Sequence, residues 1–193
     1  MWIVGNDRGN AETNMRKYME FDVLLLELAN RYFDKLGKYP NKTKLIKLAY
    51  LAEIFYKRWT NNRMTEVEWI FLHYGPYVKE YDHYLKAITN TYIQRGDFVT
   101  VITDSKSINT YNGDIEIALQ RALEFSRNDL NDILDFIYFD TEPMLSAVNR
   151  GEVLNFNCVL SESHYKTIKI QVPEETISTI RSKVKKWLSE HAK

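Results

Sequence analysis

Apolar residues recur at helical spacing in two long stretches of the N-terminal half of the chain. In the first they run from Phe21 to Leu36, and Gly37 follows where a helix would naturally end. In the second, over residues 42–59, they form two separate stripes, which predicts a central helix buried on two sides. The rest of its surface is basic, and we interpret it as a solvated face made of Lys42, Lys44, Lys47, Lys57 and Arg58.

A strand followed by a helix is predicted for the next segment. Residues 67–74 are almost continuously apolar and rich in β-branched and aromatic types, which is typical of a strand covered on both faces. Gly-Pro at 75–76 ends the strand, and the proline suits the first turn of a helix whose apolar stripe continues to Ile88. Within residues 91–103, two β-prone runs flank Arg-Gly-Asp and predict a short hairpin.

Helical patterns dominate the second half of the chain. A weak one covers residues 117–123 and a stronger one covers residues 130–138. In front of the stronger one, Ser126 is followed three residues later by Asp129, which resembles a capping arrangement. Residues 165–172 alternate weakly, which indicates a strand.

Two further helices are predicted from their first turns. Thr141 is a good N-cap, and it predicts a short helix over residues 142–150 that Gly151 would end. Pro173 is followed by two glutamates and an apolar stripe at helical spacing, which predicts a C-terminal helix.

These elements together predict a predominantly helical α+β fold, with a compact helical domain and a small β-sheet or hairpin. Residues 1–18 show no sustained period, and we interpret them as a flexible N-terminal arm. No linker divides the rest, so residues 19–193 are expected to form a single globular domain that includes the C-terminal helix.

Composition narrows the class of protein. Hydrophobic residues make up 45% of the 193 residues, enough for a core, and Gly and Pro are too sparse for a collagen-like or low-complexity chain. Lys and Arg balance Asp and Glu at 26 each, so no overall attraction to nucleic acid or anionic lipid is expected. The longest apolar run is far too short to span a membrane, and Cys158 is the lone cysteine. We therefore expect a soluble, cytoplasmic protein without membrane association.

The usual signatures of catalysis and metal binding are missing from the sequence. The four histidines are not at metal-ligand spacing, and no glycine-rich phosphate loop or nucleophile elbow occurs. His73 lies in the predicted strand, where a hydrogen-bonded core histidine is the favoured interpretation over a general base. Acidic pairs such as Asp140 with Glu142 are interpreted as solvated side chains. No metal and no cofactor are expected, and we predict that the protein is not an enzyme.

The Gly75-Pro76 turn has two interpretations. Backbone N–H groups at the start of a helix can bind an anion, but the proline removes one donor, so we favour a role in redirecting the chain. Tyr74 and Tyr77 flank the turn, and tyrosines beside a rigid turn can form a protein-docking surface.

Several of these segments carry a family resemblance. A helix reading K-L-x-K-L-x-Y-x-A is followed by a tryptophan-bearing strand, by Y-G-P and, farther on, by T-E-P with a glycine behind it. The matching residues are Lys44, Leu45, Lys47, Leu48, Tyr50, Ala52, Trp69, Tyr74, Gly75, Pro76, Thr141, Glu142, Pro143, Met144 and Gly151. In this combination the chain resembles the Panacea domain family, also described as the SocA-like or phage GepA-like antitoxin domain.

The resemblance implies a compact helical domain with a small sheet that acts without catalysis. Proteins of this family are similar to antitoxins that neutralise toxins encoded beside them, and one is an adaptor that delivers its toxin to a protease. The implied partners are therefore a cognate protein toxin from an adjacent gene and, for an adaptor, a cellular protease. Some relatives carry a DNA-binding helix-turn-helix domain, for which residues 1–18 are too short, so nucleic acid is not an expected partner.

The motif residues are assigned two roles. We expect the aromatic turn to help form the toxin-docking surface, through Trp69, Tyr74, Gly75, Pro76 and Tyr77. The other motif residues are expected to be structural: Lys44, Leu45, Lys47, Leu48, Tyr50, Thr141, Glu142, Pro143 and Met144. A core position is at least as good an interpretation for Trp69 itself, because packing dictates residue type at buried positions.

Two other function classes stay open at this point. A nucleic-acid-binding transcriptional regulator would need a local basic patch and would bind duplexes in a strongly salt-dependent way. A small hydrolase would need His73 or an acidic pair as its acid–base groups. We rank the protein-binding antitoxin first, the regulator second and the enzyme last.

Overall fold

The computed structural model describes residues 18–95, 98–104 and 111–163, together with residues 175, 178–179, 181–183 and 185–186. The helices in this part of the chain are α1 (Phe21–Leu36), α2 (Lys42–Thr60), α3 (Tyr81–Ile88), α4 (Gly113–Glu124), α5 (Leu130–Asp140) and α6 (Glu142–Ser146), with short 3₁₀ turns at Phe125–Arg127 and Phe156–Cys158. The strands are β1 (Trp69–Leu72), β2 (Gly75–Val78), β3 (Thr91–Arg95) and β4 (Phe98–Ile102). The prediction of a predominantly helical α+β fold is confirmed.

Parts of the sequence prediction fall outside this description. The N-terminal arm, apart from Tyr18, and the strand predicted over residues 165–172 lie outside the described residues. Where the chain is described between residues 175 and 186 it is helical, as the C-terminal pattern predicts. The division into an arm and one globular domain stays a prediction.

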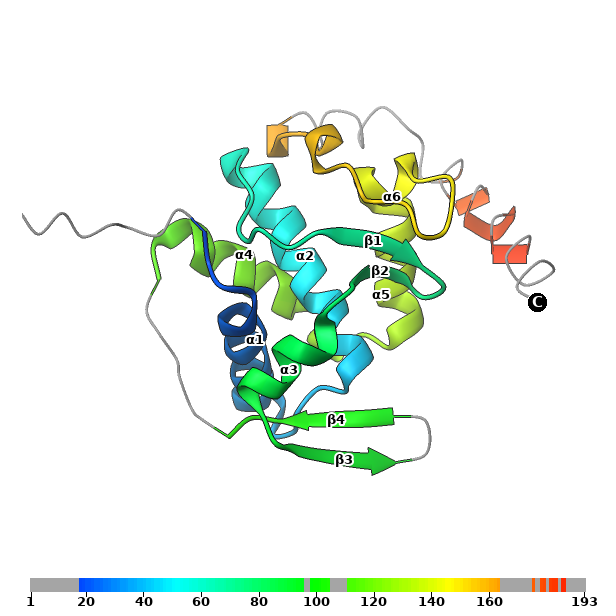
Figure 1. Cartoon of the computed structure of the whole chain (residues 1–193). Helices are drawn as coiled ribbons and strands as arrows, with labels where there is room; N and C mark the ends of the chain where they lie inside the picture. The colour runs from blue at the N-terminus through cyan, green and yellow to red at the C-terminus, as the bar shows by residue number, and fades with distance from the viewer. Residues whose placement is uncertain are drawn as a thin grey trace, which may run out of the picture.

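Helix α2 runs through the middle of the molecule. Figure 1 shows α1 and α4 on one side of it and the β1–β2 hairpin and α5 on the other. Every residue from Leu45 to Phe55 is buried, so this helix is enclosed on all sides over three turns. The predicted solvated basic face is wrong at Lys47 and Arg58, which are each only 2% exposed, because the hairpin and α5 cover them.

The ends of the first two helices follow from single residues. Gly37 adopts the left-handed conformation with a φ of 67°, and its N–H donates to the carbonyl of Phe33 at 2.7 Å. Asn41 caps α2, because its side-chain oxygen accepts a hydrogen bond from the N–H of Lys44 at 2.7 Å. The chain therefore turns sharply between α1 and α2, as predicted.

The β1–β2 hairpin corrects the prediction for residues 67–78. The first strand ends at Leu72, and the segment from Gly75 is a second strand antiparallel to the first, so the predicted helix start at Pro76 is wrong. Gly75 has a φ of 81°, which is accessible to glycine and lets the chain reverse directly after β1. Pro76 is tolerated because β2 is the outer strand of its sheet, where a missing N–H leaves no ladder bond unmade.

The segment after α6 lies along the other edge of β1. The N–H of Gly151 donates to the carbonyl of Phe71 at 2.6 Å, and the N–H of Leu154 donates to the carbonyl of Trp69 at 2.8 Å. The helix predicted over residues 142–150 is therefore wrong beyond Ser146, where α6 ends. β1 is paired on both of its edges, and this holds the hairpin firmly to the body of the protein.

The capping predictions farther along the chain are only partly right. Asp129 is the N-cap of α5 and accepts from the N–H of Asp132 at 2.9 Å, while Ser126 lies buried in the preceding 3₁₀ turn. Thr141 precedes α6 without a side-chain capping bond, because its hydroxyl donates to the carbonyl of Ile137 instead. The hairpin predicted within residues 91–103 is confirmed as β3 and β4.

A buried carboxylate fixes the loop that leaves α2. Glu53 is fully buried, and its oxygens accept hydrogen bonds from the N–H of Met64 at 3.1 Å and from the N–H and hydroxyl of Thr65. Arg63 lies 3.3 Å away and supplies the opposite charge. The loop then delivers the chain to β1 in a fixed position.

Replacing Glu53 by Ala should lower the free energy of unfolding by about 3 kcal/mol, because buried backbone donors then lose their acceptor. Urea denaturation followed by circular dichroism measures the change. Glu66→Ala removes an exposed carboxylate from the same loop and should change the free energy by less than about 0.5 kcal/mol. Equal effects of the two substitutions would contradict the role of Glu53 in fixing the loop.

Candidate protein-binding site

The separate motifs of the sequence meet around α2. Lys47 donates a hydrogen bond to the carbonyl of Pro76 at 2.8 Å, which joins the helix motif to the Y-G-P motif. Tyr50 lies 3.0 Å from the hydroxyl of Thr141, which joins the helix motif to T-E-P. Its ring also packs edge-on against Trp69, with ring centroids 5.3 Å apart. Residues far apart in the sequence therefore form one connected set.

The T-E-P residues are structural in their contacts. Because the Thr141 hydroxyl donates to the Ile137 carbonyl, the Tyr50 hydroxyl must be the donor toward Thr141. Glu142 forms a 3.0 Å ion pair with the buried Arg58. The two residues that follow, Pro143 and Met144, are buried.

The remaining helix-motif residues pack α2 against its neighbours. Lys44 donates to the carbonyls of Ser126 and Asn128 at 2.9 and 2.6 Å, across from the start of α5. Leu45 and Leu48 are fully buried. These helix-motif residues therefore help to hold α2 in place.

The five residues expected at a docking surface occupy different environments. Trp69 is only 1% exposed and packs edge-on against Phe21 and Tyr50, so it lies in the core. Gly75 and Pro76 are also buried, and Tyr77 is half-buried. Tyr74 is 73% exposed at the tip of the hairpin, which makes it the side chain of this group most accessible to a partner.

A cavity of about 450 Å³ opens beside the hairpin tip. It is bordered by Lys47 at the back, by Tyr74 and Tyr77 on the hairpin, and by His73 and Arg150 at the rim. His73 is exposed in the turn, so its interpretation as a core histidine is wrong; the strand ends at Leu72, two residues earlier than predicted. Its Nδ1 lies 2.8 Å from Nη1 of Arg150, which brings the loop before Gly151 onto the turn.

Exposed apolar side chains on α6 and on the segment after it were missed by the sequence analysis. Val148 and Val153 are 81% and 51% exposed; Val148 precedes the segment that pairs with β1, and Val153 lies within it. Leu145, on the short helix α6, is 61% exposed. The sequence analysis expected a helix over residues 142–150, whereas α6 ends at Ser146. We call Tyr74, Leu145, Val148 and Val153 the hairpin face.

Lys47 is an unusual group at the back of the cavity. Burial lowers the pKa of its ammonium from 10.5 to about 7, because the charged form loses its hydration. Its one recorded hydrogen bond goes to the Pro76 carbonyl, and within the described part of the chain it forms no ion pair. The protein thus keeps a desolvated cation behind the hairpin.

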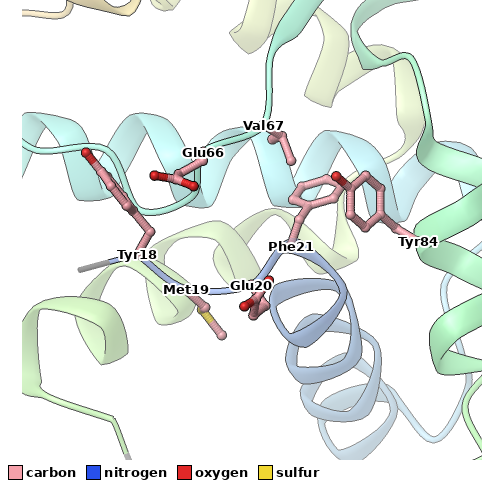
Figure 2. Close-up of a pocket in the computed structure, with 7 residues that line it drawn as sticks. All are labelled: Tyr18, Met19, Glu20, Phe21, Glu66, Val67 and Tyr84. Carbon is pink, nitrogen blue, oxygen red and sulfur yellow. The ribbon is translucent and has the colours of Figure 1, made fainter. Parts of the chain in front are cut away.

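A larger hollow, of about 750 Å³, lies where the described chain enters α1. Figure 2 shows its lining, with the rings of Phe21 and Tyr84 side by side and two carboxylates, Glu20 and Glu66, at its border. The two rings pack edge-on with centroids 5.0 Å apart. None of the family-motif residues borders this hollow, so the motifs do not mark it as a functional site.

Metal and membrane sites can be assessed for the described residues. Over these ranges, no three His, Cys, Asp or Glu side chains come together as a metal site. None of the helices described is long and apolar enough to cross a membrane.

The comparisons with known proteins agree with the motif geometry. The sequence profile described as antitoxin SocA-like, Panacea domain matches residues 45–187, which is most of the chain. The chain therefore belongs to the antitoxin SocA-like, Panacea domain family, and the resemblance seen in the motif residues is confirmed. No curated protein and no solved structure gave a significant match.

Lys47→Met should remove a pH dependence of stability. The unfolded lysine keeps its proton up to a pKa near 10.5 whereas the folded one loses it near 7, so the unfolded state binds more protons between these values. Wild-type stability relative to Lys47→Met should therefore rise by about 1 kcal/mol per pH unit between those limits.

Denaturation curves at several pH values measure this difference. Lys79→Met, which changes an exposed lysine just after β2, serves as the control and should show a flat difference. A flat difference for Lys47→Met as well would show that the buried ammonium keeps an ordinary pKa.

Proposed function

We propose that this protein is a non-catalytic antitoxin that binds and neutralises a protein toxin encoded by an adjacent gene. The observation that carries the proposal is the exposure of Tyr74 at the tip of a hairpin whose other motif residues are buried or half-buried. Membership of an antitoxin-like family supplies the class of partner. The cytoplasm stays the expected compartment.

The hairpin is suited to binding because it is already ordered. β1 is paired with β2 on one edge and with the segment from Gly151 to Leu154 on the other. Lys47 ties the second strand to α2 through the Pro76 carbonyl. A partner that contacts Tyr74 therefore meets a side chain on a fixed backbone, which lowers the entropic cost of association.

The chemistry of the hairpin face favours a protein partner. A tyrosine offers a large apolar ring and a hydroxyl, and such side chains are enriched at binding hot spots. Leu145, Val148 and Val153 are further exposed apolar side chains, on α6 and on the segment after it. We infer that the toxin covers these side chains and loses access to its own target.

Occlusion by binding requires no reaction at the site. His73, the side chain that a hydrolase would use, has Arg150 as its recorded hydrogen-bonding partner and lies in an exposed turn. Arg150 does not orient the imidazole as the carboxylate of a catalytic triad would. Delivery of the bound toxin to a protease is a further proposal that would use a second surface.

The function is tested by co-expression. Each open reading frame that flanks this gene is expressed in growing cells with and without the protein, and the two products are co-purified. We expect one flanking product to arrest growth, the protein to restore it, and a stable complex to form. Growth arrest that the protein does not relieve, with no complex, would overturn the proposal.

Tyr74→Ser should weaken binding of the toxin by about 30-fold or more, the loss expected for a hot-spot aromatic. Calorimetric titration of the purified toxin gives the affinity, and the melting temperature shows that the fold is kept. Tyr92→Ser, which changes an exposed tyrosine on the other hairpin, is the matched control and should bind as the wild type does. Unchanged affinity of the Tyr74 variant would exclude the hairpin tip from the interface.

A further inference from the structure

The cavity behind Tyr74 is cationic. It contains the ammonium of Lys47 and the guanidinium of Arg150, together with the imidazole of His73, and none of the described residues that border it is acidic. These groups come from three separate segments: α2, the β1–β2 turn and the loop before Gly151. The fold therefore concentrates positive charge at one point next to the hairpin face.

The ammonium of Lys47 forms few hydrogen bonds for a buried charged group. It has three donor positions, and one of them is used by the Pro76 carbonyl at 2.8 Å. Buried cations are normally paired, because a desolvated charge without a counter-charge is destabilising. A negatively charged group entering the cavity would supply the missing partner where the low dielectric strengthens the attraction.

Lys47 and Gly75 both border the cavity. Gly75 lies over Lys47, and a Cβ at this position would stand 3.7 Å from the Nζ atom. From the α5 side, Tyr138 approaches the same point, where a Cβ would be 3.6 Å from its hydroxyl. A Cβ at position 75 would therefore stand in ordinary contact with both polar groups.

We propose that this cavity binds a carboxylate side chain, an Asp or Glu of the protein toxin, between Lys47 and Arg150. The inference rests on the proposed function, which provides a protein partner whose surface covers Tyr74. Arginine forms a two-point contact with a carboxylate, and the lysine ammonium adds a charge-assisted hydrogen bond. The hairpin face then supplies apolar contact area, while the cavity fixes the position of the toxin.

The proposal also predicts how binding depends on pH. The charged and titratable groups that border the cavity are Lys47, His73, Tyr74, Tyr77 and Arg150, and Tyr138 lies close to Gly75 from the α5 side. Burial lowers the pKa of Lys47 to about 7. Burial raises the pKa values of Tyr77 and Tyr138, so these two tyrosines stay neutral around pH 7. Carboxylate binding should weaken as the pH rises above 7, because Lys47 then loses its proton.

The first arm of the test uses a small probe. The blocked residue N-acetyl-glutamate-N′-methylamide is titrated into the ¹⁵N-labelled full chain, and the amide resonances of Gly75 and Tyr77 are followed. We expect saturable shifts in the millimolar range, no such shifts with the glutamine analogue, and weaker binding at higher pH. Absence of saturation, equal shifts with the glutamine analogue, or tighter binding of inorganic phosphate would overturn the carboxylate assignment.

Variants separate the charges from the fold. Lys47→Met and Arg150→Gln should each weaken binding of the probe and of the toxin by about tenfold or more, since each removes one partner of a desolvated charge pair. Arg150 is exposed, so its variant keeps the test valid if Lys47→Met folds poorly. Lys79→Met, an equal loss of charge at an exposed position, should change either affinity by less than about twofold.

The two proposals can fail separately. If the wild type neutralises and binds the toxin but the Lys47 and Arg150 variants bind it equally well, the carboxylate contact is wrong and the antitoxin function stands. If the probe binds as expected but no flanking product is neutralised, the antitoxin function is wrong. In that outcome the cavity binds carboxylates, but its assignment to a toxin is overturned.

Discussion

The burial of α2 on every side is the constraint on which the other features depend. A helix enclosed from Leu45 to Phe55 cannot leave its polar side chains to water, so each must find a partner in the surrounding elements. Glu53 forms hydrogen bonds with the loop before β1, Tyr50 with the turn before α6, and Lys47 with the second strand of the hairpin. The helix therefore positions three segments that are distant in the sequence.

This constraint explains why binding and folding features are so closely connected. The bond that holds β2 in place is made by Lys47, the same side chain that leaves a desolvated positive charge at the back of the cavity. A carbonyl satisfies part of that ammonium but cannot neutralise it. The hairpin that α2 supports also carries Tyr74 outward. A single buried helix thus supports the hairpin that carries Tyr74 and also contributes Lys47 to the cavity.

The sequence predicted the helices and the second hairpin well, because helical spacing and turn residues are local signals. It failed at the first hairpin, since Gly-Pro also suits a helix start. The pairing of β2 with β1 is not encoded in the local pattern around Gly-Pro. It treated Lys47 and Arg58 as solvated because charge alone does not reveal what covers a side chain. It proposed Trp69 and Tyr74 together for a docking surface, although Trp69 begins β1 in the core and Tyr74 lies exposed in the turn. The exposed apolar residues after α6 could not be found, because the segment lies along β1 instead of forming a helix.

The central claim is that neutralisation is stoichiometric binding and not a reaction. The most direct measurement is a titration of purified toxin with this protein, in which toxin activity and complex formation are recorded in the same samples. The account predicts that activity falls in proportion to the complex formed, ends at a fixed molar ratio, and returns when the complex is dissociated, with the toxin mass unchanged. Complete inactivation by a small fraction of an equivalent, or a lasting change in the toxin mass, would contradict it.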